Sequence, residues 1–308
     1  MIHKNHNTSL HTQIIYGSHY AQIMLQQLKI EILEYQKTGA VLGVPTLVII
    51  LLGDNHASKI YVNNKVKQAA NVGIICRIIN LDLTTTQDDL ILLLARLNHD
   101  KSVHGIIVQL PLPQHINTLN IINNIDYRKD VDGFHPLNIG YLASGYHDGF
   151  VACTPSGCMH LIKAALGQDL GGKHVVVVGR SLIVGKPMSY LLTNANCTTT
   201  LAHSQTINLK SVTTLADIVI LAVGKAKMFD KTYFNSNAVV IDVGINKAEN
   251  SSLSICGDAD FDDCFGHVKY ITPVPYGVGP MTIAYLLYNT FIAYKKSLDL
   301  PLKSHNKF

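Results

Sequence analysis

The chain has 308 residues, of which 47% are hydrophobic and only 15% are charged, with a formal net charge of +4. This composition indicates a globular protein and excludes the disordered, collagenous and coiled-coil classes. The small charge and the lack of a run of Lys and Arg argue against a nucleic-acid partner. Single hydrophobic cores stop growing at about 250 to 300 residues, so two domains are expected.

The N-terminal residues and the cysteines indicate the cellular compartment, which we expect to be the cytoplasm. The 6 cysteines include no CxxC pair, which is typical of reduced thiols in the cytoplasm. Residues 1–13 lack the apolar stretch of a signal peptide, and the longest apolar runs, such as 47–52, are too short to cross a bilayer. None of the 15 His residues stands in a metal-binding motif. We therefore expect a cytoplasmic protein with no membrane partner and no metal.

Short apolar runs alternate with amphipathic stretches in the first half of the chain. The expected elements are a strand at 46–53, a helix at 60–73, a strand at 75–81, a helix at 86–100 and a strand at 103–113. Gly73 suits the position after a helix, and Thr86 with two acidic residues behind it suits a helix start. This alternation is typical of a parallel sheet covered by helices.

The alternation restarts after a Gly-rich segment, and we place a domain boundary near Phe150. The expected elements are a helix over 159–168, a strand at 174–179, a helix at 186–195 and strands at 198–203, 216–224 and 238–245. This order indicates a second α/β domain of the Rossmann type. A last helix is expected over 280–298, because a Pro in its first turn is followed by helical apolar spacing.

A glycine turn follows the first strand of the second domain. In HVVVVGRSLIVGKP (174–187), an apolar strand leads into Gly179, Arg180, Ser181 and Gly185 and then into a helix. Such a turn offers backbone N–H groups and a helix N-terminus to a diphosphate. Because the spacing departs from GxGxxG, an ordinary glycine turn of an α/β domain is the alternative.

The end of the next strand indicates which dinucleotide is bound. An NAD site usually has an acidic residue there, which holds the ribose 2′-hydroxyl. This chain instead has LAHSQT at 201–206, without an acid. Arg180, His203 and Ser204 suit a 2′-phosphate. We therefore expect NADP rather than NAD.

Polar residues of the first domain are candidates for chemistry. Tyr61 and Lys65 lie four residues apart on an expected helix, so a ring and an amine share one face, where they can combine stacking with proton transfer. Gln109 ends a strand, at an edge where ligand sites collect in α/β proteins. Asp130 and Asp132 lie in a turn, and one of them could hold a donor-rich heterocycle by a bidentate hydrogen bond.

Each of these candidates has a simpler interpretation. A Tyr/Lys pair at this spacing is usually a solvated helix surface, a strand-end Gln often caps backbone groups, and a turn carboxylate most often forms an Asx turn. The short-chain dehydrogenases also use Tyr-x-x-x-Lys, but there it follows the glycine turn. Here Tyr61 precedes Gly179, and that order argues against those enzymes.

Taken together, several segments resemble the sequence blocks of the methylenetetrahydrofolate dehydrogenase/cyclohydrolases. The resemblance runs from about Tyr16 to about Thr290. The segments are GDNHASKIYVNNK (53–65), GIIVQLPLP (105–113), KDVDGFHPLNIG (129–140), CTPSG (153–157), VVGRSLIVGKP (177–187), IDVGIN (241–246), GDADF (257–261) and TPVPYGVGPMT (272–282). Blocks in a fixed order are much more specific than any one of them.

The resemblance implies an enzyme that oxidises 5,10-methylenetetrahydrofolate to the 5,10-methenyl form with NADP and then hydrolyses it to 10-formyltetrahydrofolate. It implies that Lys65 is the catalytic lysine, Gln109 its hydrogen-bonding partner and Tyr61 the ring that stacks on the folate. Asp132 would anchor the pterin. The implied cofactor-binding residues are Gly179, Arg180, Ser181, Ile183, Gly185, His203, Ser204 and Ile245. The implied substrate-binding residues are Tyr61, Asp132, Pro273, Pro275, Tyr276 and Gly277.

The resemblance also implies the architecture. Residues 1–150, together with a returning C-terminal helix in 280–308, would form a folate-binding catalytic domain, and residues 151–279 a Rossmann-like NADP-binding domain. The fold class is therefore α/β. A cleft between the domains would bring the nicotinamide to the folate, and such enzymes are typically homodimers joined through their cofactor domains.

Tyr276 is the largest departure from the family pattern, since similar proteins have PVPGGVGP where this chain has PVPYGVGP. Tyr does not easily adopt a positive φ, and it adds a ring where the backbone approaches the substrate. One alternative is therefore a member of the family with only one of the two activities. Another, from a different class, is a dinucleotide-binding protein without catalysis.

Overall fold

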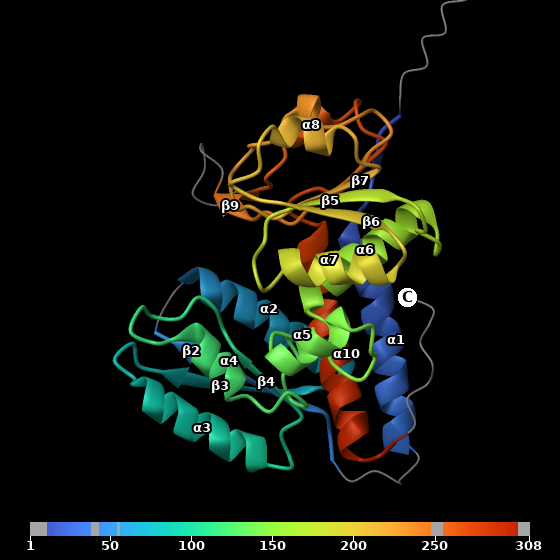
Figure 1. Cartoon of the computed structure of the whole chain (residues 1–308). Helices are drawn as coiled ribbons and strands as arrows, with labels where there is room; N and C mark the ends of the chain where they lie inside the picture. Colours follow the sequence, from blue (N-terminus) through green and yellow to red (C-terminus); the bar gives the residue numbers. More distant parts are fainter. Residues whose placement is uncertain (1–10, 38–42, 54–55, 248–254, 301–308) are drawn as a thin grey trace, which may run out of the picture. The chain divides into compact units, whose positions relative to one another are not determined.

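The computed structural model describes residues 11–37, 43–53, 56–247 and 255–300 (Figure 1). Of residues 56–61 it describes only the backbone. The chain forms two compact units, one from residues 19–156 and 281–308 and the other from residues 1–18 and 157–280. We call them the lysine unit, after Lys65, and the glycine-turn unit, after Gly179, and describe each by itself.

The lysine unit contains a parallel sheet with the strand order β3-β2-β4. Its strands are β2 (Thr46–Leu52), β3 (Ile75–Leu81) and β4 (Gly105–Val108), and the intervening helices are α2 (His56–Val72) and α3 (Gln87–His99). All five elements were expected from the sequence. Thr86 caps α3, because its side chain accepts a hydrogen bond from the N–H of Asp89.

Alternate residues of β2 face two different cores. Leu47, Ile49 and Leu51 pack with residues of α1 (Gly17–Lys37), α2 and α10 (Val278–Ser297), whereas Val48 and Ile50 pack with residues of α3 and α4 (Thr118–Asn123). A strand buried on both faces explains why 47–52 is a continuous apolar run. The short helix α5 (Pro136–Ala143) follows the β4 region and begins with Pro at its first position.

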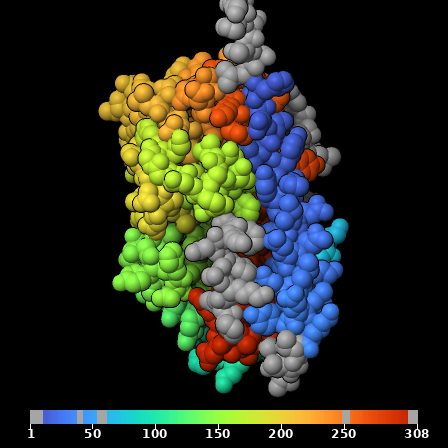
Figure 2. Space-filling model, turned by 90° about the vertical axis from the view of Figure 1, so that its right-hand side faces the viewer, coloured from blue at the N-terminus to red at the C-terminus, as the bar shows by residue number. Residues whose placement is uncertain are grey.

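The last helix, α10, packs on the lysine unit, as the resemblance to the family implied. Leu286, Leu287 and Phe291 of α10 belong to the same core as Leu28 and Ile32 of α1. Helix α1 was not predicted from the sequence. Its outer side faces solvent on the face shown in Figure 2, where α1 is blue, and Ile23, Ile30 and Leu33 are among its exposed residues.

The glycine-turn unit contains a six-stranded parallel sheet with the order β1-β11-β8-β7-β5-β6. Its strands are β1 (Gln13–Ile14), β5 (His174–Val178), β6 (Thr198–Ala202), β7 (Ile218–Leu221), β8 (Val239–Asp242) and β11 (Tyr270–Ile271). A two-stranded antiparallel pair, β9 (Asn246–Lys247) and β10 (Ile255–Cys256), lies outside this sheet. The strand order confirms a Rossmann-like α/β unit.

The remaining helices belong to or border this unit. They are α6 (Cys153–Leu166), α7 (Gly185–Asn194), α8 (Leu209–Thr213), η1 (Lys231–Tyr233) and α9 (Phe261–Cys264). One face of the sheet packs Val176, Val219 and Val240 against Phe229 and Phe234. In Figure 1, α8 lies on one side of this sheet and α7 on the other.

The first described residues differ from the expected domain division. We expected residues 1–150 to form one domain, but Gln13 pairs with Tyr270 and Ile14 with Ile271, so β1 extends the sheet of the glycine-turn unit. A two-residue strand carries no periodic signal in the sequence, and its partner lies at the far end of the chain. A second backbone contact lies in the first turn of α1, where Ser18 N–H donates to Tyr276 O at 3.0 Å.

Three findings concern disulfides, membrane-spanning helices and metal-binding groups. None of the six cysteines, all of which lie in the described part of the chain, forms a disulfide. No described helix is both long and apolar enough to cross a lipid bilayer. The described residues include no group of three or more His, Cys, Asp or Glu side chains that could hold a metal ion.

Candidate active site

The side chains of Lys65 and Gln109 meet at the carboxyl end of the parallel sheet in the lysine unit. Lys65 is half-buried on α2, and its Nζ donates to Gln109 Oε1 at 3.0 Å. Gln109 follows β4 directly and is held there, because its N–H donates to Ile50 O at 2.9 Å and its Nε2 to Leu110 O at 3.0 Å. With Nε2 occupied in this way, the amide oxygen is oriented toward the lysine.

Asp132 lies within electrostatic range of this pair. Burial raises the pKa of Asp132 to about 6, while the positive charge of Lys65 opposes that rise and the nearby Asp130 adds to it. Among the described residues, no hydrogen bond to the Asp132 carboxylate is found. The Asp132 carboxylate is therefore available to an added ligand. Lys65 also acts on Cys76: burial raises the pKa of the Cys76 thiol to about 11, and the lysine charge opposes that rise.

Asp130 serves the fold instead. Its buried carboxylate accepts hydrogen bonds from the N–H of His135 at 2.7 Å and from Asn138 Nδ2 at 2.8 Å. Asn138 in turn accepts a bond from the N–H of Phe150 at 3.1 Å. Of the two turn carboxylates that the sequence left as candidates, Asp130 thus orders the loop, whereas the Asp132 carboxylate has no hydrogen-bond partner in the described part of the chain.

Two residues that bond to the loop of Asp132 were not predicted from the sequence. Cys153 Sγ donates to Val131 O at 3.2 Å, and Asn289 Nδ2, from α10, donates to Val131 O at 2.9 Å and to Val151 O at 3.1 Å. Burial raises the pKa of the Cys153 thiol well above its ordinary value. A single Asn within the apolar stretch AYLLYNTFIA was the only signal in the sequence for this contact.

Tyr61 lies on α2 one turn before Lys65. Its side chain lies outside the described residues. The expected shared face of this pair follows from the helical spacing alone.

The glycine turn after β5 has the backbone geometry of a phosphate-binding turn. Gly179 has a φ of +122°, and a Cβ there would collide with the carbonyl of Ala222. A Cβ at Gly185, the first residue of α7, would collide with the carbonyl of Gly179. Both positions therefore require glycine, and the backbone between β5 and α7 is open to a ligand.

The side chains around this turn fit a dinucleotide. Ser181 Oγ accepts from the N–H of Val184 at 3.1 Å, which leaves its hydroxyl proton free to donate. Arg180 is exposed, and Ile183 and Ile245 are exposed by 39% and 47%. At the end of β6, His203 Nδ1 accepts from the N–H of Gln205, and Ser204 is exposed. No acidic residue stands in that segment, which suits a phosphorylated ribose.

A buried aspartate, which the sequence analysis missed, joins two loops at the carboxyl edge of this sheet. Asp258 Oδ2 accepts from the N–H of Val223 at 2.7 Å, and its Oδ1 accepts from the N–H of Lys225 at 2.8 Å and from Asn246 Nδ2 at 2.9 Å. Its own N–H donates to Asp242 Oδ1 at 3.0 Å. This network holds the segment after β8, which includes Ile245.

The segment Pro273–Gly277 belongs to the glycine-turn unit. Val274–Pro275 is a cis peptide, and Gly277 is buried against the backbone of Pro273. Tyr276 has a φ of +80°, and the residue is 61% exposed. The structure thus has the bulky residue in the left-handed conformation that the sequence analysis regarded as unfavourable.

Family comparisons agree with this arrangement. Residues 15–132 match the catalytic domain of the tetrahydrofolate dehydrogenase/cyclohydrolases. Residues 152–298 match their NAD(P)-binding domain. The chain belongs to the tetrahydrofolate dehydrogenase/cyclohydrolase family. The lysine unit therefore carries the region that matches the catalytic domain, and the glycine turn lies in the region that matches the NAD(P)-binding domain.

Individual members of the family are similar over nearly their whole length. The bifunctional protein FolD of Rickettsia typhi is 49% identical over 287 residues, which are 93% of this chain and 99% of that protein. The crystal structure of the bifunctional enzyme FolD from Campylobacter jejuni has a TM-score of 0.88 and 43% identity, covering 92% of this chain and 99% of that one. The structure of Trypanosoma brucei FolD, complexed with NADP cofactor and an inhibitor, has a TM-score of 0.86 and 34% identity, covering 93% and 98%.

Proposed function

We infer that this chain is a bifunctional enzyme that oxidises 5,10-methylenetetrahydrofolate to the 5,10-methenyl form and hydrolyses that product to 10-formyltetrahydrofolate. The observation that carries this inference is the hydrogen bond of 3.0 Å between Lys65 and Gln109. Both residues lie in the region that matches the catalytic domain of the family. A protein that only binds a dinucleotide has no need of an oriented lysine near an unpaired carboxylate. Membership of the family and the free carboxylate of Asp132 both favour catalysis.

The oxidation removes a hydride from the methylene carbon and leaves a methenyl cation. When bound, NADP supplies the hydride acceptor. Asp132 and the ring of Tyr61 are proposed to fix the substrate, Asp132 through hydrogen bonds to the pterin and Tyr61 by stacking. Four residues of another segment are proposed as further substrate-binding residues: Pro273, Pro275, Tyr276 and Gly277.

The hydrolysis begins when water adds to the methenyl carbon. The water oxygen becomes the formyl oxygen and loses both of its protons, while one carbon–nitrogen bond of the five-membered ring breaks. The released nitrogen keeps the electron pair of that bond and gains one proton, and the other proton leaves to the solvent, which removes the positive charge of the methenyl cation. Lys65 is the group proposed to move these protons, because an amine can give and accept a proton at one position. Gln109 is proposed to hold the amine in place through its 3.0 Å contact. No metal is required for these steps.

We propose NADP, rather than NAD, as the physiological cofactor. The exposed Arg180, with His203 and Ser204 at the end of β6, provides donors where a 2′-phosphate is expected. The similarity to the Trypanosoma brucei enzyme, which was crystallised with NADP, supports the same choice. Arg180→Ser should raise the KM for NADP at least about tenfold, as expected for the loss of a charge-assisted hydrogen bond, and leave the KM for NAD nearly unchanged. Equal effects on both cofactors would contradict the choice.

Two further properties are proposed, a cellular compartment and an oligomeric state. The six cysteines, none of which forms a disulfide, favour a cytoplasmic enzyme, since thiols stay reduced there. The resemblance to the family favours a homodimer joined through the NADP-binding units. Sedimentation equilibrium of the purified chain tests the dimer, and a mass of one chain across micromolar concentrations would exclude it.

The absorbance of methenyltetrahydrofolate tests the two activities in one time course. With methylenetetrahydrofolate and NADP, the wild type should show a small transient, because the product is hydrolysed as it forms. Accumulation without decay would reveal a dehydrogenase that has lost the cyclohydrolase. Lys65→Met should abolish the hydrolysis, whereas Lys67→Met, an exposed position on the same helix, should not. Unchanged turnover in Lys65→Met would overturn the assignment.

A further inference from the structure

A pocket of about 760 Å³ lies in the lysine unit, away from the catalytic lysine. His104, which lines it, directly precedes β4, whereas Gln109 directly follows β4. The pocket is therefore at the amino edge of the sheet and the Lys65–Gln109 pair at the carboxyl edge, roughly 15 Å away along the strand. Lys65, Gln109 and Asp132 do not line it. Its size is that of a small-molecule site.

Positive charge predominates in the lining. The charged side chains are those of Lys101, Arg128, Lys129 and Lys296 against Asp126 and Asp148, four cations and two anions, which leaves an excess of two positive charges. The Arg128 charge is matched by Asp126, whose Oδ2 lies 2.6 Å from Arg128 Nη2. The remaining excess comes from the three lysines against Asp148.

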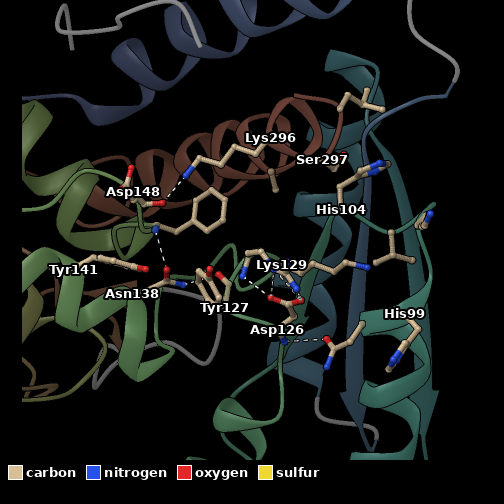
Figure 3. Close-up of a pocket in the computed structure, with 17 residues that line it drawn as sticks. His99, His104, Asp126, Tyr127, Lys129, Asn138, Tyr141, Asp148, Lys296 and Ser297 are labelled. Atoms are coloured by element: carbon tan, nitrogen blue, oxygen red, sulfur yellow. Dashed lines mark hydrogen bonds and ion pairs between the residues drawn. The ribbon is translucent and has the colours of Figure 1, made fainter. Parts of the chain in front are cut away.

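Two of these ammonium groups are fixed by backbone carbonyls rather than by carboxylates. Lys129 Nζ donates to Leu97 O at 3.0 Å and to Asp100 O at 2.8 Å, and Lys296 Nζ donates to Asp148 O at 2.6 Å. Within the described residues, neither forms an ion pair. Burial lowers the pKa of both lysines, so each carries its charge at an energetic cost that a bound anion would reduce. Figure 3 shows the Lys296 side chain reaching toward Asp148.

Aromatic rings lie beside these charges. The rings of Tyr127 and Tyr141 are 6.3 Å apart at an angle of 47°, and both residues are half-buried in the pocket wall. Asn138, which also lines the pocket, is bonded to the backbone of Tyr127, because its Nδ2 donates to Tyr127 O at 2.9 Å. In Figure 3, Tyr127 lies between Asn138 and Lys129. A planar ring bound here would have a stacking surface next to ammonium groups.

We propose that this pocket is a second ligand site, which takes an organic phosphate that carries a planar ring, that is, a nucleotide-like anion. The ammonium groups of Lys101 and Lys296 face the phosphate groups, and the tyrosine rings contact the planar part. The site is distinct from both the folate and the dinucleotide sites, since its lining residues belong to neither.

Isothermal titration calorimetry of the full chain tests the proposal, with metal-free ATP as the probe and NADP present at saturation to occupy the glycine turn. One ATP per chain is expected to bind. Lys101→Gln/Lys296→Gln should weaken binding about tenfold or more, because two charge-assisted contacts are lost. Asp148→Asn should tighten it, because a negative charge leaves the pocket. Lys67→Gln/Lys163→Gln, which removes two lysines outside the pocket, is the matched control.

Two further probes test the phosphate part and the ring part of the ligand separately. Inorganic pyrophosphate and adenosine should each bind more weakly than ATP, since each occupies one half of the pocket. Absence of ATP binding to the NADP-saturated chain would overturn the proposal, and so would ATP binding that the pocket variants leave unchanged. Pyrophosphate that binds as tightly as ATP would overturn the role of the rings. Thermal unfolding of each variant confirms that it is folded.

Discussion

Lys65 Nζ lies 3.0 Å from Gln109 Oε1, a contact that joins helix α2 to the end of strand β4. Two backbone contacts hold Gln109, so the amide oxygen has a fixed position and direction. A lysine side chain has four rotatable bonds, and a single oriented acceptor selects among its conformations. The contact therefore limits where the amine can give or accept a proton.

Replacement of Gln109 by Leu should show whether the orientation of the Lys65 amine affects catalysis without affecting the binding of NADP. The variant keeps the approximate volume but loses the acceptor, and we expect kcat of the cyclohydrolase to fall between about tenfold and a hundredfold, the range of a misplaced proton-transfer group. The KM for NADP should stay within about twofold, since Gln109 does not belong to the glycine-turn unit. Gln26→Leu, an exposed position on α1, is the control. A normal kcat in Gln109→Leu would show that the contact has no part in the hydrolysis.

Tyr276 offers a test of backbone strain. Its φ of +80° is unfavourable for a side chain with a Cβ, typically by about 1 kcal/mol. Tyr276→Gly and Tyr276→Ala both remove the exposed ring, but only Gly relieves the strain. The Gly variant should therefore have a free energy of unfolding about 1 kcal/mol above that of the Ala variant in urea titrations. Equal values would show that the conformation is not strained.

The same two variants report on the substrate. Their ring losses are identical, so a contact between the Tyr276 ring and the folate should raise the KM for methylenetetrahydrofolate to a similar extent in both. An increase in Tyr276→Ala alone would instead assign the effect to the backbone. Activity that appears only in Tyr276→Gly would mean that the wild-type chain has departed from the family reaction.

Most of the fold could be predicted from periodicity. The buried strands of both units, such as β2 and β5, are continuous apolar runs of Val, Ile and Leu, and the helices between them show amphipathic spacing. Helix α1 was missed, because a polar N-terminus precedes it and its apolar residues are interrupted by Gln, Glu and Lys. Strand β1 could not be predicted, because its two residues gain their partner only when Tyr270 comes to lie beside them.

The candidate site was predictable only where residues are close in sequence or lie at strand ends. Gln109 was a candidate because it ends β4, and the choice between Asp130 and Asp132 needed the structure, since only the hydrogen bonds of Asp130 reveal its role in the loop. Asn289 reaches the same loop from α10, a contact across 158 positions of sequence that no local pattern contains. The resemblance to the family supplied the roles, which neither spacing nor composition gives.

The raised pKa of Asp132 predicts that the kcat/KM of the dehydrogenase reaction falls on the acid side of its pH profile. Burial raises this pKa to about 6, so the carboxylate accepts a proton as the pH falls through about 6 and loses its ability to accept hydrogen bonds from the pterin. The kcat/KM for methylenetetrahydrofolate should therefore rise with pH and level off above about 7. Asp132→Asn should have a lower kcat/KM that is flat across this range. An acid limb of the same position in Asp132→Asn would assign the titration to another group.

The contact between α10 and the loop of Asp132 should affect both stability and substrate binding. Asn289→Leu leaves the buried carbonyls of Val131 and Val151 without their Asn donor, at a cost of about 2 kcal/mol in the free energy of unfolding. Thr290→Val is the control, because the Thr290 hydroxyl donates to Leu286 O within its own helix, and the change should cost less than about 1 kcal/mol. Since Val131 precedes Asp132, the Leu variant should also raise the KM for methylenetetrahydrofolate while that for NADP stays unchanged. A loss of stability with an unchanged folate KM would show that Asn289 supports the fold without positioning Asp132.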